Sequence, residues 1–293
     1  MQKRAEILIC EVKMVDFDSV IDAAALFEAC FSSVRAGAEV FFIGKTVLGV
    51  PIPCISVGGG EGCSLFVGAH HGTEHITANI LLKYALECSP RNRVYVVPML
   101  NVDGCAVSQG ALCAAATMRP FFEKLSRGDV VHWQANARGV DLNHNYNAGF
   151  DKCKAAERAL GITSPSPTRY GGEYPESEPE TAALCALVRR LSQRLHNVVA
   201  LHTQGEEIYF EYDGKCPDGA RELAEDFSLA SGYALSRPEN AAGHGGFKDW
   251  VIDKFGIPAF TVECGAGKNP LPPSDFSSIY EKVRPILDIA AAF

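Results

Sequence analysis

A histidine and a glutamate three residues apart, His71 and Glu74, directly follow an apolar run that is typical of a strand. Two further runs of the same kind lead into His202 and Glu263. Imidazoles and carboxylates are suitable zinc ligands, and a catalytic zinc takes three protein ligands and leaves a fourth position for water. The residue types therefore predict a metal site of two histidines and one glutamate, with the second glutamate free beside it.

The three strands that must position these side chains are predicted at 64–69, 198–201 and 259–262. In an open α/β sheet, ligands gather beyond the carboxyl ends of the strands, so groups from separate strands can converge there. Apolar residues recur at helical spacing directly after the first motif. We therefore expect Glu74 at the start of a helix, where it lies beside His71.

Each motif can also be explained by a purely structural role, without metal binding or catalysis. His71 alone could be a loop histidine bonded to the backbone, and Glu74 a carboxylate favoured by the dipole at a helix start. The neighbours His70 and His75 fit as ligands on spacing alone. A carboxylate such as Glu263 at the end of an apolar strand is costly unless it is paired, which favours a functional role.

The remaining pattern indicates an α/β protein. Helices are predicted over 17–34, over 180–195 and from about 276, strands over 39–43, 51–57 and 94–100, a turn at 101–104 and a long loop over 161–179. Strands interleaved with helices predict one domain with a mixed, mainly parallel twisted sheet covered by helices on both faces. Within it, residues 1–43 form an N-terminal helix and first strand, and residues 44–293 form the catalytic core.

Composition narrows the function classes. The 293 residues are 47 % hydrophobic, enough for a full core, and the net charge of −8 without runs of like charge argues against nucleic-acid or anionic membrane partners. The 11 cysteines are odd in number and contain no CxxC pair, which predicts reduced thiols. No apolar run has the length of a signal peptide core or a membrane span, so we expect a cytoplasmic protein.

The chain resembles the zinc metallocarboxypeptidase family from about residue 44 to its end, in four motifs that occur in the same order: His71-Gly-Thr-Glu74, Asp141-Leu-Asn143, His202 and Thr261-Val-Glu263. The resemblance implies that family's fold, and it implies that His71, Glu74 and His202 bind one zinc ion. It also implies that Glu263 is the general base that assists attack of zinc-bound water. Arg138 matches the arginine that polarises the scissile carbonyl, although it could also be a solvated loop cation.

Three departures from the family pattern concern substrate binding. The usual Asn-Arg pair that holds the C-terminal carboxylate of the substrate is Asn143-His144 here, which puts simple carboxypeptidase action in question. The family's mobile tyrosine falls on Ala241, with His244 as the nearby substitute. The residue at the base of the specificity pocket is Lys248, which favours a substrate carboxylate or is an ordinary lysine covering apolar surface.

A narrower resemblance accommodates these departures. Four segments are similar to the γ-D-glutamyl-diamino acid peptidases, namely Asp141-Leu-Asn-His-Asn-Tyr146, His202-Thr-Gln-Gly205, Gly246-Phe-Lys-Asp-Trp250 and the stretch at 265–272. That branch hydrolyses the amide between the γ-carboxyl of D-glutamate and meso-diaminopimelate in bacterial cell-wall (murein) peptides. The resemblance thus implies a small muropeptide with free carboxylates as substrate, recycled or imported into the cell.

Other functions remain open at this point. A metallocarboxypeptidase that releases C-terminal acidic residues is the nearest alternative, followed by a zinc deacylase of N-acyl amino acids. A non-catalytic peptide-binding protein with a vestigial metal site belongs to a different class, and Glu263 argues against it because a pure binding site needs no base. The sequence leaves the oligomeric state undetermined.

Overall fold

The computed structural model describes residues 16–35, 37–110, 117–237 and 243–293. Its strands are β1 (Glu39–Lys45), β2 (Pro51–Val57), β3 (Cys63–Val67), β4 (Arg93–Val97), β5 (Leu195–His202), β6 (Glu207–Tyr209), β7 (Ala234–Leu235) and β8 (Ala259–Glu263). They form one sheet in the order β1-β2-β4-β3-β5-β8-β6-β7. Strands β4, β3, β5 and β8 are mutually parallel, while the pairings β1–β2, β2–β4 and β6–β8 are antiparallel.

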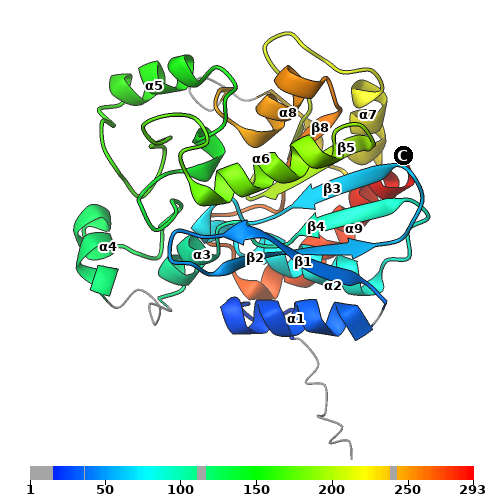
Figure 1. The fold of residues 1–293 in the computed structure, drawn as a ribbon, viewed down its shortest axis with the longest axis horizontal. Coiled ribbons are helices and arrows are strands. Elements are labelled where there is room, and N and C mark those ends of the chain that lie inside the picture. Colours follow the sequence, from blue (N-terminus) through cyan, green and yellow to red (C-terminus); the bar gives the residue numbers. More distant parts are fainter. Residues whose placement is uncertain (1–15, 36, 111–116, 238–242) are drawn as a thin grey trace, which may run out of the picture.

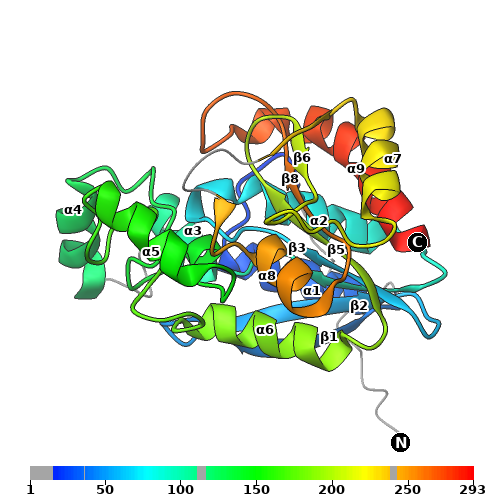
Figure 2. The same ribbon diagram turned by 90° about the horizontal axis from the view of Figure 1, so that it is seen from above.

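The helices lie on both faces of this sheet. They are α1 (Ala23–Arg35), α2 (Ile76–Glu87), α3 (Val102–Ser108), α4 (Arg119–Ser126), α5 (Phe150–Ala159), α6 (Pro179–Leu191), α7 (Ala220–Ser231), α8 (Phe247–Phe255) and α9 (Phe276–Ala292). Figure 1 shows α6 and α8 on one side of the sheet and α1, α2 and α9 on the other. Figure 2 shows α4 and α5 together at one end of the molecule. The predicted α/β class, with a mixed sheet and helices on both faces, is confirmed.

The alternation of side chains along β3 explains why this strand is central. Leu65 and Val67 pack into the apolar cluster under α6 and α8, and Phe66 packs into the cluster under α2 and α9. All three are fully buried. A strand that is apolar on both faces is stable only between two helical layers, and this places its carboxyl end in the middle of the sheet.

Several boundaries differ from the predicted ones because polar side chains cap the helices. The first helix begins at Ala23 rather than near residue 17, since the Asp22 carboxylate accepts a hydrogen bond from the Ala25 amide at 2.9 Å. The predicted turn at 101–104 is wrong. Asn101 caps α3 instead, with its side chain accepting from the Gly104 amide at 2.9 Å.

One helix and one strand also end earlier than predicted. The predicted helix over 180–195 ends at Leu191, because the chain turns at Ser192 and enters β5 at Leu195. The predicted strand over 94–100 ends at Val97, before Pro98. The predicted loop over 161–179 is confirmed up to Glu178, since α6 begins at Pro179, and the predicted helix from Phe276 is confirmed.

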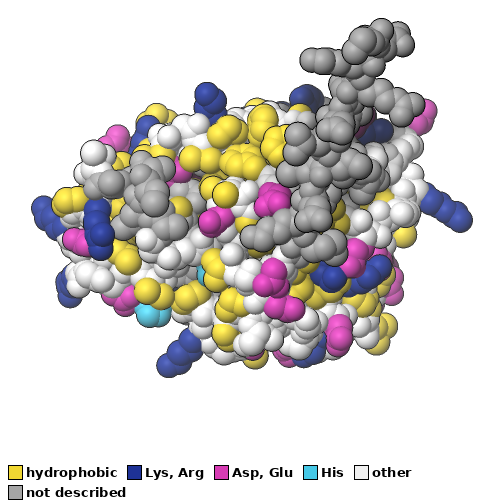
Figure 3. Space-filling model, turned by 90° about the horizontal axis from the view of Figure 1, so that it is seen from below, with side chains coloured by type: hydrophobic (Ala, Val, Ile, Leu, Met, Phe, Trp, Pro, Cys, Tyr) yellow, Lys and Arg dark blue, Asp and Glu magenta, His cyan; other side chains and the backbone are white. Residues whose placement is uncertain are grey.

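The distribution of surface charge and the state of the cysteines can be compared with the predictions from composition. Figure 3 views the face that α1 covers and shows basic and acidic side chains interspersed among exposed hydrophobic ones. The exposed hydrophobic residues of α1 and β1 include Phe31, Val34 and Phe42. None of the helices in the described part of the chain combines the length and the hydrophobicity that a membrane span requires. The cysteines in the described part of the chain are all free, and most are buried. Residues 1–15, which belong to the predicted N-terminal part, lie outside the described residues.

Candidate active site

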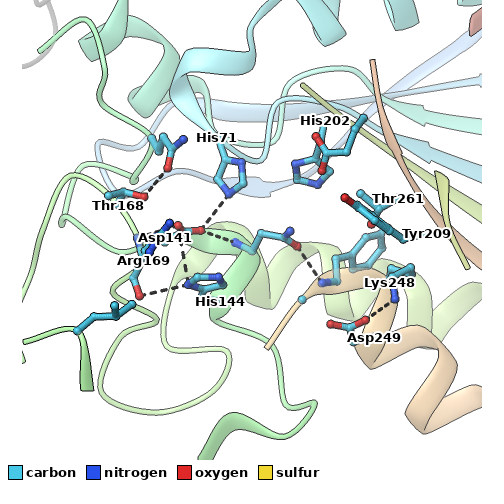
Figure 4. A pocket seen from close by; sticks show the side chains of 16 residues that line it. His71, Asp141, His144, Thr168, Arg169, His202, Tyr209, Lys248, Asp249 and Thr261 are labelled. Carbon is cyan, nitrogen blue, oxygen red and sulfur yellow. Dashed lines mark hydrogen bonds and ion pairs between the residues drawn. The ribbon is translucent and has the colours of Figure 1, made fainter. Parts of the chain in front are cut away.

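A cleft of about 630 Å³ lies at the carboxyl ends of β3, β5 and β8. His71 follows β3, while His202 and Glu263 are the last residues of β5 and β8 and are directly paired in the parallel register. The predicted convergence of side chains from three separate strands is therefore present in the structure. Figure 4 shows His71 and His202 on the same side of this cleft.

His71, Glu74 and His202 form a compact group whose ligand atoms all lie within 4.8 Å of one another. The Glu74 carboxylate sits between the imidazoles, with Oε1 2.8 Å from Nδ1 of His71 and Oε2 3.0 Å from Nδ1 of His202. Glu74 and His202 are buried, and His71 is the more accessible of the three. The neighbours His70 and His75, which spacing alone had left open, are outside the group.

The local conformation of the motif depends on Gly72. Glu74 ends the short 3-10 turn Gly72–Glu74 just before α2, so it lies beside His71 as predicted. A Cβ atom on Gly72 would lie 2.4 Å from the carbonyl oxygen of Gly104 and 2.5 Å from that of Trp133. Only glycine permits this approach, which packs the motif against α3 and the loop that carries Trp133.

The electrostatic field of the group favours positive charge between its members. Burial opposes a charged imidazole, but the carboxylates of Glu74 and Asp141 outweigh it and raise the pKa of His71 well above its ordinary value. Burial likewise opposes ionisation of Glu74, yet His71 and His202 lower its pKa to about 2. A site that holds an ionised carboxylate against two imidazoles is chemically suited to a divalent cation.

The donor set fits zinc in particular. Two imidazole nitrogens and one carboxylate are the ligand types of a catalytic zinc site, which keeps one position open. Nδ1 is the nitrogen of His202 that faces Glu74. Nε2 of the same ring is buried without a hydrogen-bond partner among the described residues. The residues present are therefore able to hold the zinc ion that the sequence predicted.

Asp141 orients the first of these histidines, a role that sequence reasoning missed. Its Oδ1 lies 3.0 Å from Nε2 of His71, and its Oδ2 accepts a hydrogen bond from the Arg169 amide at 2.9 Å. Asp141 is buried, and despite that burial the histidines His144 and His71 hold its pKa well below the usual range. A carboxylate bonded to the second nitrogen of a ligating imidazole fixes both its tautomer and its orientation.

We expect Asp141→Asn to weaken zinc binding by about 10- to 100-fold, because the amide cannot hold the His71 ring with the same charge and geometry. Competition with a chromophoric chelator would measure the affinity. Asp129→Asn is the matched control, since Asp129 also bonds a histidine, His132, but both residues are exposed and neither lines the cleft. Equal zinc affinity in the wild type and Asp141→Asn would contradict the orienting role.

Glu263 lies in the cleft without belonging to the three-residue group. Burial, the largest effect, acts with the nearby Glu74 carboxylate to raise the pKa of Glu263 to about 7, although His202 opposes the shift. A carboxyl group with a pKa near neutrality can both accept and return a proton. Its placement therefore suits the free glutamate that the sequence predicted.

The structure does not bring Arg138 to this cleft. Its side chain is 54 % exposed, lies 3.5 Å from Glu178, and lines a separate depression with Tyr170 and Glu178. The same loop contributes Gln134 to the cleft instead, and the Gln134 carbonyl accepts a hydrogen bond from the Gly72 amide at 2.9 Å. The expected carbonyl-polarising role of Arg138 is thus not supported by its position, because an oxyanion donor must lie within hydrogen-bond reach of the reacting carbonyl.

The predicted substrate-binding residues divide into two groups. Asn143, His144 and Lys248 line the cleft. His244 does not, since it is half-buried elsewhere with Nδ1 3.2 Å from the Tyr212 hydroxyl. Ala241, the position of the family's mobile tyrosine, lies outside the described residues.

Lys248 and Asn143 are also engaged by the protein itself. The Lys248 side chain is only 5 % exposed, and its ammonium donates to the Glu211 carbonyl at 2.7 Å and pairs with Asp249. Oδ1 of Asn143 accepts a hydrogen bond from the Phe247 amide at 3.0 Å, which leaves its NH₂ group available to the cleft. Figure 4 shows Lys248 beside Asp249 on the far side of the cleft from Asp141.

Two further cleft residues, Thr168 and Arg169, come from the long loop, and sequence reasoning did not single them out. The Thr168 hydroxyl bonds Oε1 of Gln134, and the Arg169 carbonyl accepts from Nδ1 of His144 at 3.2 Å. The positive φ of Arg169, 66°, has no sequence signal except the proline- and glycine-rich surroundings. These loop residues become neighbours of the strand ends only in the folded chain.

Comparisons with known proteins place the chain among peptidases. The zinc carboxypeptidase family model matches residues 35–285. The chain is 33 % identical over 260 residues to gamma-D-glutamyl-L-diamino acid endopeptidase 1 of Lysinibacillus sphaericus, which covers 82 % of this chain and 64 % of that protein. It therefore spans less than two thirds of that relative's length.

Two solved structures share the fold. Bovine thrombin-activatable fibrinolysis inhibitor, in complex with tick carboxypeptidase inhibitor, has a TM-score of 0.71 at 19 % identity and covers 94 % of this chain and 97 % of its own. Murein-tripeptide amidase MpaA from Escherichia coli O157 has a TM-score of 0.56 at 23 % identity and covers 86 % and 91 % respectively.

Proposed function

The chain belongs to the zinc carboxypeptidase family, and from this premise we propose that it is a zinc-dependent peptidase that hydrolyses the γ-D-glutamyl-diaminopimelate bond of murein peptides. One observation carries the proposal: His71, Glu74 and His202 form one compact group beside a cleft that Glu263 also lines. The similarity to a γ-D-glutamyl-L-diamino acid endopeptidase supports the choice of bond. Recycled or imported muropeptides in the cytoplasm remain the predicted source of substrate.

The roles of the protein's own groups follow from their positions. His71, Glu74 and His202 would hold the zinc ion, which when bound polarises a carbonyl and lowers the pKa of a coordinated water to about 7. Glu263 accepts the proton of the attacking water and returns it to the leaving amine, since its carboxylate lines the cleft without belonging to the ligand group. Asp141 keeps the His71 ring in place throughout.

Gln134 lines the cleft and is the candidate for the role that was expected of Arg138. Its Oε1 is occupied by the Thr168 hydroxyl, so its NH₂ group is the part left to donate to a substrate oxygen. Glutamine is among the side chains that stabilise developing oxyanions, although a neutral amide does so less strongly than a guanidinium. We assign the carbonyl-polarising contact to Gln134 on this basis.

The decisive assay uses L-Ala-γ-D-Glu-meso-diaminopimelate. We expect the protein to release free diaminopimelate, a chelator to abolish this release, and added zinc to restore it. Chromatography of the released amino acid would measure the reaction, and an ordinary α-linked peptide ending in glutamate is the parallel substrate. Cleavage of the α-linked peptide alone would instead support a carboxypeptidase that releases acidic residues.

A further inference from the structure

We propose that Arg169, rather than Lys248, is the cation that binds a carboxylate of the peptide substrate. The inference deepens the function proposed above and rests on it, because murein peptides of this class carry several free carboxylates. Three features support this assignment: the charge of Lys248 is already neutralised, the backbone of Arg169 is fixed, and its guanidinium matches a carboxylate.

Lys248 is poorly placed to give up its present partners. Its side chain is almost fully buried, and its ammonium contacts the Asp249 carboxylate and the Glu211 carbonyl. Transferring it to a substrate would leave the Asp249 carboxylate, which is also buried, without its counter-charge. Breaking a buried ion pair in this way is strongly unfavourable. Lys248 therefore contributes to the shape of the cleft while its charge is cancelled inside the protein.

Arg169 is in the opposite situation. It lines the same cleft and its side chain is exposed. Among the residues that the structure describes, no carboxylate forms an ion pair with its guanidinium, and no side-chain hydrogen bond holds it. A guanidinium presents a planar fork of donors that matches both oxygens of a carboxylate, and it remains charged at any working pH. An unpaired cation of this kind in a peptide-binding cleft is suited to an anionic substrate group.

The backbone of Arg169 is fixed relative to the candidate zinc site. Its amide donates to Oδ2 of Asp141 at 2.9 Å, and the other oxygen of Asp141 bonds His71. Its carbonyl accepts from Nδ1 of His144 at 3.2 Å. These bonds hold a φ of 66°, a left-handed conformation that is uncommon for arginine. Figure 4 shows Asp141 with His71 on one side and Arg169 and His144 on the other.

This arrangement compensates for the missing arginine at position 144. His144 uses Nδ1 to support the Arg169 carbonyl, so the histidine positions the loop that supplies the guanidinium. The single Asp141 carboxylate thereby links a zinc-ligand candidate with a carboxylate-binding candidate. A substrate held by Arg169 would be anchored to a segment whose backbone is fixed relative to the reacting centre, which favours productive orientation.

The test measures binding without turnover. In the zinc-loaded Glu263→Gln protein, calorimetry would compare L-Ala-γ-D-Glu-meso-diaminopimelate with the same peptide carrying amides in place of its carboxylates. We expect Arg169→Gln to weaken binding of the peptide with free carboxylates by about 10- to 100-fold, the usual contribution of a charge-assisted contact. The affinity for the amidated peptide should stay unchanged. Arg169→Lys should recover part of the loss, because it restores the charge without the fork.

Arg127→Gln is the matched control, since Arg127 is another exposed arginine with positive φ, 54°, at the end of α4 and away from the cleft. It should bind both peptides as the parent does. Equal weakening of both peptides by Arg169→Gln, or no weakening, would overturn the inference, and so would a failure of the parent to bind the peptide with free carboxylates. Cleavage by the wild type is scored separately: an intact tripeptide refutes the proposed function, while the binding comparison still decides the role of Arg169.

Discussion

Replacing Glu263 with glutamine should lower turnover by about two orders of magnitude or more while the protein keeps its zinc. Glutamine has nearly the same shape but cannot accept the proton of the attacking water. Glu263 lies outside the group of His71, Glu74 and His202, so the metal should not depend on it. Hydrolysis of the tripeptide and zinc content by atomic absorption would be measured on the same samples.

The control for this variant is Glu225→Gln, an exposed glutamate on α7. It should match the wild type in both measurements. Full activity of Glu263→Gln would remove the assigned role of the base. Loss of zinc together with activity would show that Glu263 is a ligand, and the free-base assignment would then be incorrect.

Replacing His202 with alanine should abolish both zinc binding and turnover. The substitution removes one of the three proposed ligands, and the two remaining groups cannot satisfy a zinc ion that takes three protein ligands in catalytic sites. The buried Glu74 carboxylate would also lose one of its two imidazole partners. Zinc content after dialysis and activity with excess zinc would be recorded.

Because His202 is buried at the end of β5, the variant must be shown to fold. Circular dichroism would establish this, and Glu74→Gln provides a second ligand variant that nearly preserves side-chain volume. His196→Ala serves as control, since His196 is an exposed histidine on the same strand. Full zinc occupancy in folded His202→Ala would exclude this residue as a ligand.

The local sequence pattern was sufficient to predict that the side chains of His71, Glu74, His202 and Glu263 converge. Three of them, His71, His202 and Glu263, stand at the ends of apolar runs, and apolar runs of that length form buried parallel strands. Parallel strands of one sheet bring their carboxyl ends to the same edge. The pairing of His202 with Glu263 in the β5–β8 register is a direct consequence.

The loop residues could not be predicted in the same way. Arg138 and Arg169 both lie in irregular segments with similar composition, and nothing in the local sequence shows which of them faces the cleft. The structure pairs Arg138 with Glu178 and exposes Arg169 beside His144. Hydrogen bonds between residues far apart in the chain make this choice, such as that between Asp141 and His71.

The sequence by itself determined the α/β class, the central strands and the likeness of the site to a zinc peptidase, because these depend on periodicity and on which residue types end each strand. The tertiary structure alone decided which cations remain available to substrate. Lys248 is neutralised by Asp249 once both are buried, whereas Arg169 is left unpaired among the described residues. Burial and contacts with residues distant in the sequence decide whether a charged side chain is neutralised. Neither can be read from the residues that neighbour it in the sequence.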